Sequence, residues 1–299
     1  MNYLLHLLIY FCMYGIVALS LNLVVGYCGL FTLAHAAFFA VGGYTYALTT
    51  IKFGWGFIPA SALAMLIGGI LSLAVSLPAW RFRGDFFVLI TLAVQTFLFS
   101  LIYNWTSTDS PPATLRNLTN GPIGLAGIKK PVIFGIRLDT IGSIAMLSTL
   151  LLLISGFIFW LLKSSPWGRL LKSMRDDELA ARGLGKNVRL AKVYVLAISC
   201  AFTALAGTIY SSYVTFIDPS SALLNQSILL LCMLIVGGTG NFRGPLVGTV
   251  VLLAIPEILR LVHLPDAMAA NLRLVIYGLL LIIMVHLRPQ GLVGEYRLE

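Results

Sequence analysis

Long uninterrupted apolar runs are the feature that most constrains how this chain can fold. Each run has about twenty residues, the length that an α-helix needs to cross the hydrocarbon core of a bilayer. Polar residues do not alternate with apolar ones inside the runs, as they would in the strands of a membrane barrel. The sequence therefore predicts an all-α, polytopic membrane protein with about eight or nine membrane segments in a single domain, residues 1–299. The expected segments are 3–26, 31–50, 57–79, 86–104, 139–162, 193–213, 226–239, 245–263 and 273–288.

The overall composition supports the membrane class. Charged residues make up 10% of the chain and hydrophobic residues 59%, with a mean hydropathy of +0.94, whereas a soluble domain has about 25% charged residues. The net charge of +9 is interpreted as the excess of Lys and Arg in cytoplasmic loops. Membrane lipid is therefore the expected surrounding, and no nucleic-acid partner is expected. The first residues, MNYLLHLLIYF, lack a basic n-region, so they predict a retained first span.

The segment 163–192 carries the strongest charge signal. It holds eight of the twenty Lys and Arg residues against three acidic residues, a net charge of +5. Apolar runs flank it, so it must be an aqueous loop, and its basic excess places it in the cytoplasm. Alternation then places the N-terminus and residues 214–225 outside. The loop 105–138 also falls outside; it is rich in Pro, Gly, Asn and Thr and predicts irregular surface structure that a soluble partner could meet.

The cytoplasmic loop predicts a short amphipathic helix. From Arg169 to Arg182 the chain is rich in helix formers, with an apolar stripe between the charges. Gly183 and Gly185 then end the helix, because glycine adopts the left-handed conformation of a helix stop. The acidic cluster 176–178 favours a groove on a soluble protein over anionic lipid headgroups as the binding surface.

Glycines break the helical pattern at membrane depth in two stretches, 24–44 and 235–251. Both contain the pattern V-G-x-x-G-x-F, a faint internal repeat. Backbone that unwinds in a membrane must line a cavity or be buried in protein, and paired Gly-interrupted segments are typical of a transport path. Close packing of helices is the alternative. The residues predicted to line a path are Asn22, Gly26, His35, Thr91, Gln95, Gly237, Gly238 and Gly240.

Three of these polar residues have a second interpretation. A polar group inside a membrane is costly, so it needs either a partner or a function. Asn22 and Gln95 would hydrogen-bond neighbouring helices, and His35, near a helix start, would be a satisfied structural histidine. The chain has no series of buried carboxylates of the kind that proton- or sodium-coupled carriers use.

No motif in the sequence predicts a catalytic, nucleotide-binding or metal-binding site. HExxH, GxSxG and GxxxxGK[ST] are absent, and the nearest string to a P-loop, GLGKN, has too few residues before its lysine and Asn after it. The four cysteines have neither CxxC nor metal-ligand spacing. We therefore expect no enzyme: no catalytic residue, no metal site and no cofactor in this chain.

Several segments, in order along the chain, resemble one family. They are ALSLNLVVGYCGLFTLAHAAFFAVGGY (18–44), RGDFFVLITLAV (83–94), LTNGPIGLAGI (118–128), SPWGRLLKSMRDDELAARGLG (165–185), GGTGNFRGPLVG (237–248) and RPQGLVG (288–294). They look like branched-chain amino acid ABC transporter permeases of the LivM type. The resemblance implies a type II-like importer permease in a bacterial inner membrane. It also implies three kinds of partner: a second, related permease, two cytoplasmic ATPases that hold ATP and Mg, and a periplasmic binding protein. The residues that match the family's ATPase-coupling motif are Arg175, Asp176, Asp177, Glu178, Ala181 and Gly185.

The chain departs from the family pattern at two positions. Lys186 stands where an aliphatic residue is usual, which questions the packing of the coupling loop, and Ala34 stands where glycine is common. Related permeases carry urea, short amides or other amino acids, so these substrates remain alternatives to branched-chain amino acids. The other hypotheses are a self-sufficient secondary carrier or channel, and a membrane enzyme or scaffold with a docking loop.

Overall fold

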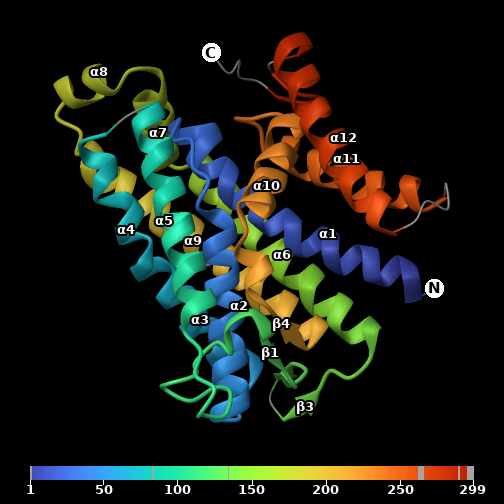
Figure 1. The fold of residues 1–299 in the computed structure, drawn as a ribbon. Coiled ribbons are helices and arrows are strands. Elements are labelled where there is room, and N and C mark those ends of the chain that lie inside the picture. The colour runs from blue at the N-terminus through green and yellow to red at the C-terminus, as the bar shows by residue number, and fades with distance from the viewer. Residues whose placement is uncertain (1, 83, 134, 262–265, 289, 295–299) are drawn as a thin grey trace.

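The computed structural model describes residues 2–82, 84–133, 135–261, 266–288 and 290–294, which form a mostly helical structure (Figure 1). The helices are α1 (Asn2–Asn22), continued by the π-helix Leu23–Tyr27, α2 (His35–Lys52), α3 (Phe57–Leu71), α4 (Leu73–Ser76), α5 (Asp85–Asn104), α6 (Ile141–Ser164), α7 (Pro166–Asp176), α8 (Glu178–Gly183), α9 (Val188–Val214), α10 (Leu224–Gly237), α11 (Gly244–Leu261) and α12 (Asp266–Leu287). Short 3₁₀ turns cover Pro78–Trp80, Gly121–Ile123 and Pro219–Ala222. The strands are β1 (Leu125–Ala126), β2 (Val132–Ile133), β3 (Ile136–Arg137) and β4 (Phe216–Ile217).

Helices occupy every stretch predicted to span the membrane. Among the described residues, five helical segments are long and apolar enough to cross a bilayer, namely Asn2–Tyr27, Phe57–Ser76, Asp85–Asn104, Ile141–Ser164 and Val188–Val214. Shorter apolar helices are Leu224–Gly237, Gly244–Leu259 and Asn271–Met284. The helical membrane class is thus confirmed, and the strands of the described residues are confined to loops. The second expected segment begins at His35 and not at residue 31, because residues 29–34 are the irregular break between two helices.

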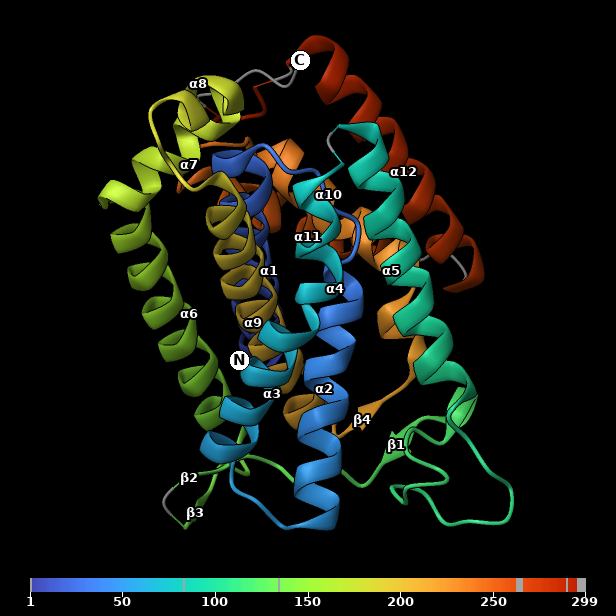
Figure 2. The ribbon, with the colours of Figure 1, turned by 90° about the vertical axis from the view of Figure 1, so that its left-hand side faces the viewer.

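The two ends of the helical body carry different structures. The pair α7–α8 lies at one end, and β1–β4 lie at the other (Figure 2). Strand β1 pairs antiparallel with β4, Leu125 opposite Ile217, and this ladder joins the loop 105–138 to the loop 214–225. Both loops predicted to be external therefore lie at the same end, away from α7–α8.

The faint sequence repeat has a structural counterpart. In each copy of V-G-x-x-G-x-F the chain leaves a helix, at the π-helix after α1 and at the end of α10. The second glycine of each copy has a left-handed backbone, with φ of +73° at Gly29 and +78° at Gly240. This conformation strains residues with a Cβ, so glycine is required at both breaks. The two breaks meet: a Cβ on Gly26 would lie 2.7 Å from the backbone nitrogen of Gly240.

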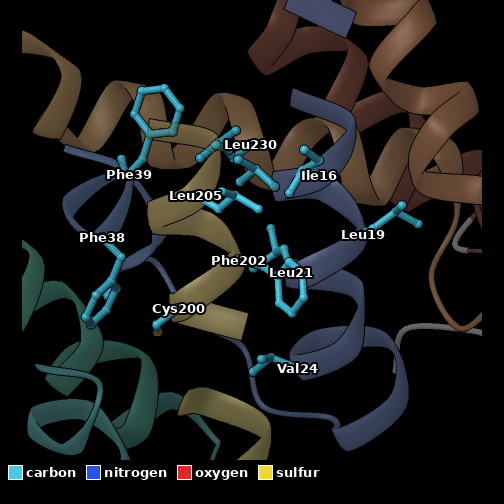
Figure 3. Packing of buried hydrophobic residues seen from close by; sticks show 14 of the residues in the cluster. Ile16, Leu19, Leu21, Val24, Phe38, Phe39, Cys200, Phe202, Leu205 and Leu230 are labelled. Atoms are coloured by element: carbon cyan, nitrogen blue, oxygen red, sulfur yellow. The ribbon is translucent and has the colours of Figure 1, made fainter. Parts of the chain in front are cut away.

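The core is centred on α2 and α9, which approach each other through small residues. Gly42 faces the backbone of Ala204, and Gly207 faces the backbone of Phe39, so close that neither position has room for a Cβ. Small residues at a crossing let two membrane helices pack backbone to backbone. Figure 3 shows large side chains filling the space around this crossing. They come from α1, α2, α9 and α10, and those labelled include Ile16, Leu21, Phe38, Phe39, Phe202, Leu205 and Leu230.

We predict that Gly207→Ala destabilises the protein. The new methyl group would fall on the carbonyl oxygen of Phe39, and forcing α2 and α9 apart should cost about 1–3 kcal/mol. Gly142→Ala is the matched control, because nothing lies within 4 Å of its added Cβ. Thermal unfolding of the detergent-solubilised protein measures both. Equal midpoints for the two variants would contradict the tight α2–α9 crossing.

Candidate functional site

The segment predicted to be the cytoplasmic loop, residues 163–192, forms two helices where the sequence predicted one. Helix α7 begins at Pro166, a residue suited to a first turn, and the Ser165 hydroxyl accepts from the Gly168 N–H at 3.2 Å. Asp177 then breaks the helix. It has an extended backbone, and its carboxylate accepts from the N–H groups of Leu179 and Ala180 at 2.8 and 3.0 Å. Asp177 is therefore the N-cap of α8, a position that favours Asp over helix continuation.

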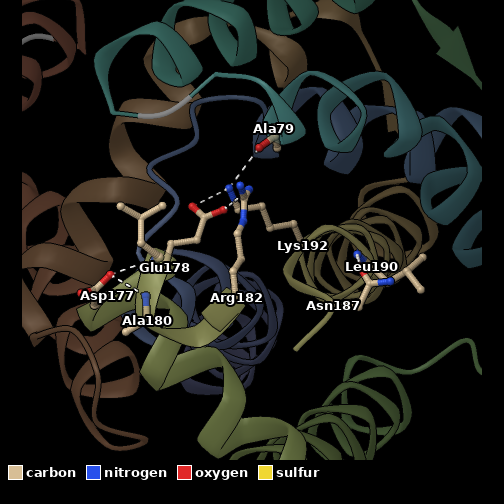
Figure 4. A network of polar contacts seen from close by, with 9 residues as sticks. Ala79, Asp177, Glu178, Ala180, Arg182, Asn187, Leu190 and Lys192 are labelled. Carbon is tan, nitrogen blue, oxygen red and sulfur yellow. Dashed lines mark hydrogen bonds and ion pairs between the residues drawn. The ribbon is translucent and has the colours of Figure 1, made fainter. Parts of the chain in front are cut away.

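A charged network fixes α8 to the transmembrane helices (Figure 4). Glu178 pairs with Arg182 at 2.7 Å and with Lys192, at the start of α9, at 3.0 Å. Lys192 also donates to the carbonyl oxygen of Ala79 at 3.0 Å. The side chains of Lys192 and Glu178 are 3% and 11% exposed, so solvent screens this pair weakly. The network connects α8, the base of α9 and the turn between α4 and α5.

Arg175 connects α7 to the break after α1. Its guanidinium donates to the carbonyl oxygen of Gly26 at 2.7 Å and to the carboxylate of Asp176 at 3.0 Å. Its aliphatic part covers Gly29, where an added Cβ would lie 2.8 Å from Arg175 Cγ. Arg175 thus contacts both the π-helix and the irregular break that follows it.

Half of the six predicted coupling residues are turned inward. Ala181 is buried, and Arg175 and Glu178 are half-buried and bond to other elements of the chain. Asp176, Asp177 and Gly185 are exposed. The assignment of these six residues as the ATPase contact stays a prediction, and the structure shows that Arg175 and Glu178 brace the α7–α8 pair within the chain.

The outer face of the pair carries two leucines: Leu179, which belongs to the predicted apolar stripe, and Leu184, which the sequence patterns did not single out. Leu179 is 68% exposed and Leu184 is 78% exposed. The sequence signal for Leu184 was a leucine between two glycines, Gly183 and Gly185, next to a charged stretch. Lys186 is exposed beside it, so this departure from the family pattern affects surface charge and not packing.

Asn22 joins the two glycine breaks. Its Nδ2 donates to the Asn241 carbonyl at 2.9 Å, and its Oδ1 accepts from the Gly240 N–H at 3.1 Å. Gly237 and Gly238 lie close to this junction and are packed against backbone, Gly237 against Gly244 and Gly238 against Gly294. Each glycine here lets another segment of the backbone approach closely.

Side chains from two other helices cap the start of α2. The Leu33 N–H donates to Thr91 at 3.1 Å, the Ala36 N–H to Ser227 at 3.2 Å and the Ala37 N–H to Gln95 at 2.9 Å. Gln95 also donates to the carbonyl oxygen of Ala222. The orphan N–H groups of a helix start inside a membrane need such acceptors. Ala34 is right-handed at this cap, so glycine is not needed there.

His35 belongs to a buried hydroxyl network. Its Nε2 lies 2.8 Å from the Ser199 hydroxyl, which donates to the Ser20 carbonyl at 2.7 Å. The Ser20 and Thr203 hydroxyls lie 2.9 Å apart. These bonds join α1, α2 and α9. The predicted path residues thus fall into two groups, one at the Asn22–Gly240 junction and one around the start of α2. Their role as a path lining stays a prediction.

These features define a polytopic helical membrane protein whose α7–α8 pair is locked to a break in its first helix. A family model described as "Branched-chain amino acid transport system / permease component" matches residues 3–285. The chain belongs to this family. The resemblance seen in the sequence is therefore confirmed, as is the expectation of a transport subunit that is not an enzyme, with ATP hydrolysis in a separate subunit.

Individual relatives agree with the family. The chain is 28% identical to the high-affinity branched-chain amino acid transport system permease protein LivM of Escherichia coli (strain K12), over 95% of this chain and 68% of that one. It is 23% identical to the probable LivM permease of Methanocaldococcus jannaschii, over 97% and 92% of the two chains. The autoinducer 2 import system permease protein LsrC of Yersinia pseudotuberculosis is 27% identical, over 60% of this chain and 55% of that one. No solved structure matches the chain.

We predict that Lys192→Met loosens the attachment of α8 to α9. The substitution removes two hydrogen bonds of a buried ammonium group and should cost about 2–3 kcal/mol. Amide hydrogen exchange in α8 should become faster, because α8 loses its tie to α9. Lys186→Met, at an exposed lysine, should change neither exchange nor unfolding. Unchanged exchange in α8 after Lys192→Met would show that the ion pair does not hold the helix.

We predict that Gln95→Leu exposes the start of α2 to fraying. The change leaves the Ala37 N–H and the Ala222 carbonyl without their side-chain partner. This loss should lower the free energy of unfolding by about 1–3 kcal/mol. Faster exchange of amides in the first turn of α2 and a lower unfolding temperature are expected. Thr96→Val is the neighbouring control, because within the described part of the chain Thr96 bonds its own helix alone, at the Leu92 carbonyl. Equal behaviour of both variants would rule out the capping role.

Proposed function

We propose that this chain is a transmembrane permease subunit of an ATP-binding-cassette importer in a bacterial inner membrane. The single observation that carries the proposal is the α7–α8 pair, which is braced on its inner face and presents apolar leucines on its outer face. This arrangement suits a groove in a soluble ATPase. The proposed partners are two such ATPases, which hold the ATP and Mg, a second permease related to this chain, and a periplasmic binding protein.

The braces describe how ATPase closure would reach the membrane. Movement of α8 pulls on Lys192 through Glu178, and so on the base of α9. Movement of α7 pulls on Gly26 through Arg175, and the Gly26 region touches Gly240 in the second break. One displacement thus reaches α1, α9 and the α10–α11 connection together, which is what alternating access requires of a rigid group.

The finer architecture belongs to the same proposal. We assign membrane segments to α1, α2, α3–α4, α5, α6, α9, α10, α11 and α12, in a type II-like importer fold with the N-terminus outside. The loops joined by β1 and β4 then face the binding protein. The names of the LivM relatives support a branched-chain amino acid, or a similar small amino acid, as the substrate. The binding protein would supply most of the selectivity.

We predict that Leu184→Asp releases the ATPases. A charge at the centre of an apolar contact removes an anchoring residue and places a carboxylate in a desolvated site, so affinity should fall by about thirtyfold or more. Co-purification of the ATPase subunits with the permease, and ATP hydrolysis stimulated by the loaded binding protein, measure the effect. Ile136→Asp is the control, because Ile136 is also apolar and exposed, at the opposite end of the molecule. Normal ATPase binding by Leu184→Asp would overturn the docking assignment.

A further inference from the structure

A cavity of about 460 Å³ lies between α1, α10, α11 and α12. Its lining comes from residues 6–14 of α1, 226–233 of α10, 252–257 of α11 and 273–277 of α12. In Figures 1 and 2, α11 and the start of α12 lie between the end of the molecule that carries α7–α8 and the end that carries β1–β4. The cavity therefore lies at an intermediate depth in the helical body. Its volume is in the range of small-molecule sites.

Two opposite charges line this cavity without meeting. Glu257 of α11 and Arg273 of α12 are both in the wall, yet within the described part of the chain neither forms an ion pair. The Nε of Arg273 is buried and has no hydrogen-bond partner among the described residues. A charged side chain at membrane depth has a high free-energy cost unless an opposite charge or a hydrogen-bond partner stabilises it. A ligand that carries both charges would satisfy both side chains.

The remaining wall is partly aromatic and partly apolar. Tyr14 accepts a hydrogen bond from Gln226 at 2.9 Å. Pro256 lacks an N–H, so the carbonyl oxygen of Leu252 one turn earlier loses its helical donor. The Tyr277 hydroxyl approaches that oxygen at 3.4 Å. The proline thus opens α11 at the cavity wall and leaves a carbonyl that faces α12.

The apolar part of the wall is formed by aliphatic side chains. Leu229 and Met233, one turn apart on α10, line the cavity together with Leu252. This surface offers no hydrogen bond to a ligand and suits an aliphatic side chain. The charged residues Glu257 and Arg273 lie on α11 and α12.

We propose that this cavity is a site on the transport path for a zwitterionic amino acid with an aliphatic side chain. Arg273 binds the carboxylate, Glu257 binds the ammonium group, and Leu229 and Met233 contact the side chain. The assignment rests on the proposed function, because it requires an importer of amino acids. It adds the place in this chain where the substrate waits after release from the binding protein.

The test uses the complete importer reconstituted in proteoliposomes, with leucine as the probe. Arg273→Met and Glu257→Gln should each lower leucine uptake by about ten- to a hundredfold, because each removes a charge-assisted contact. Leucine binding to the free binding protein should stay unchanged. Arg273→Lys keeps the charge and should retain more uptake than Arg273→Met, which separates loss of binding from loss of folding.

A second measurement reports occupancy directly. Leu229→Cys should react with a membrane-impermeant thiol reagent from outside, and millimolar leucine should slow that reaction. In the same assay 4-methylpentanoate, which lacks the ammonium group, should protect less well than leucine, and this difference should vanish in the Glu257→Gln background. Ile228→Cys is the matched control, because Ile228 is exposed on the same helix and does not line the cavity; leucine should not protect it.

The outcomes separate the two proposals. No leucine uptake by the wild-type importer would overturn the proposed substrate and this site with it. Wild-type uptake that stays unchanged in Arg273→Met and Glu257→Gln would overturn the site alone. Equal protection of the Ile228→Cys and Leu229→Cys variants by leucine would also overturn it. Loss of the second permease from the Arg273→Met complex, with no leucine protection of Leu229→Cys, would assign the cavity to subunit contact instead.

Discussion

The structure depends on satisfying the backbone where helices break inside the membrane. Lipid supplies no hydrogen bonds, so each freed N–H and carbonyl group must find a partner in the protein. At the start of α2 the partners are side chains of Thr91, Gln95 and Ser227. At the meeting of the two glycine breaks the partner is Asn22. These bonds determine how α1, α2, α5, α10 and α11 are placed relative to one another.

The same constraint connects the α7–α8 pair to the longer helices. The carbonyl oxygen of Gly26 is at a helix break, and Arg175 of α7 donates a hydrogen bond to it. Glu178 and Lys192 make a second connection of low exposure. Arg175 and Glu178 thus bond inward, whereas Leu179 and Leu184 are exposed on the outer face of the pair.

The fold class could be predicted well from the sequence, because hydrophobic length and charge distribution are local properties. The apolar runs became helices, and the glycines at 29 and 240 marked real breaks. The sequence did not predict the interruption at Asp177, because the residues on both sides of it favour a helix. A single Asp can either continue such a helix or cap the start of a new one, and here it caps α8. Gln95 and Asn22 make the interhelical bonds that were considered as an alternative to a path lining.

The sequence by itself determined the helical membrane class, the approximate positions of the apolar helices and the family. Each of these depends on neighbours in the chain. Only the tertiary structure decided the direction in which polar residues point. Arg175 meets Gly26 across the break after α1, and Glu257 and Arg273 share a cavity. Such pairings depend on how helices far apart in sequence cross, and the crossings are set by contacts such as Gly207 on Phe39, which no local pattern encodes.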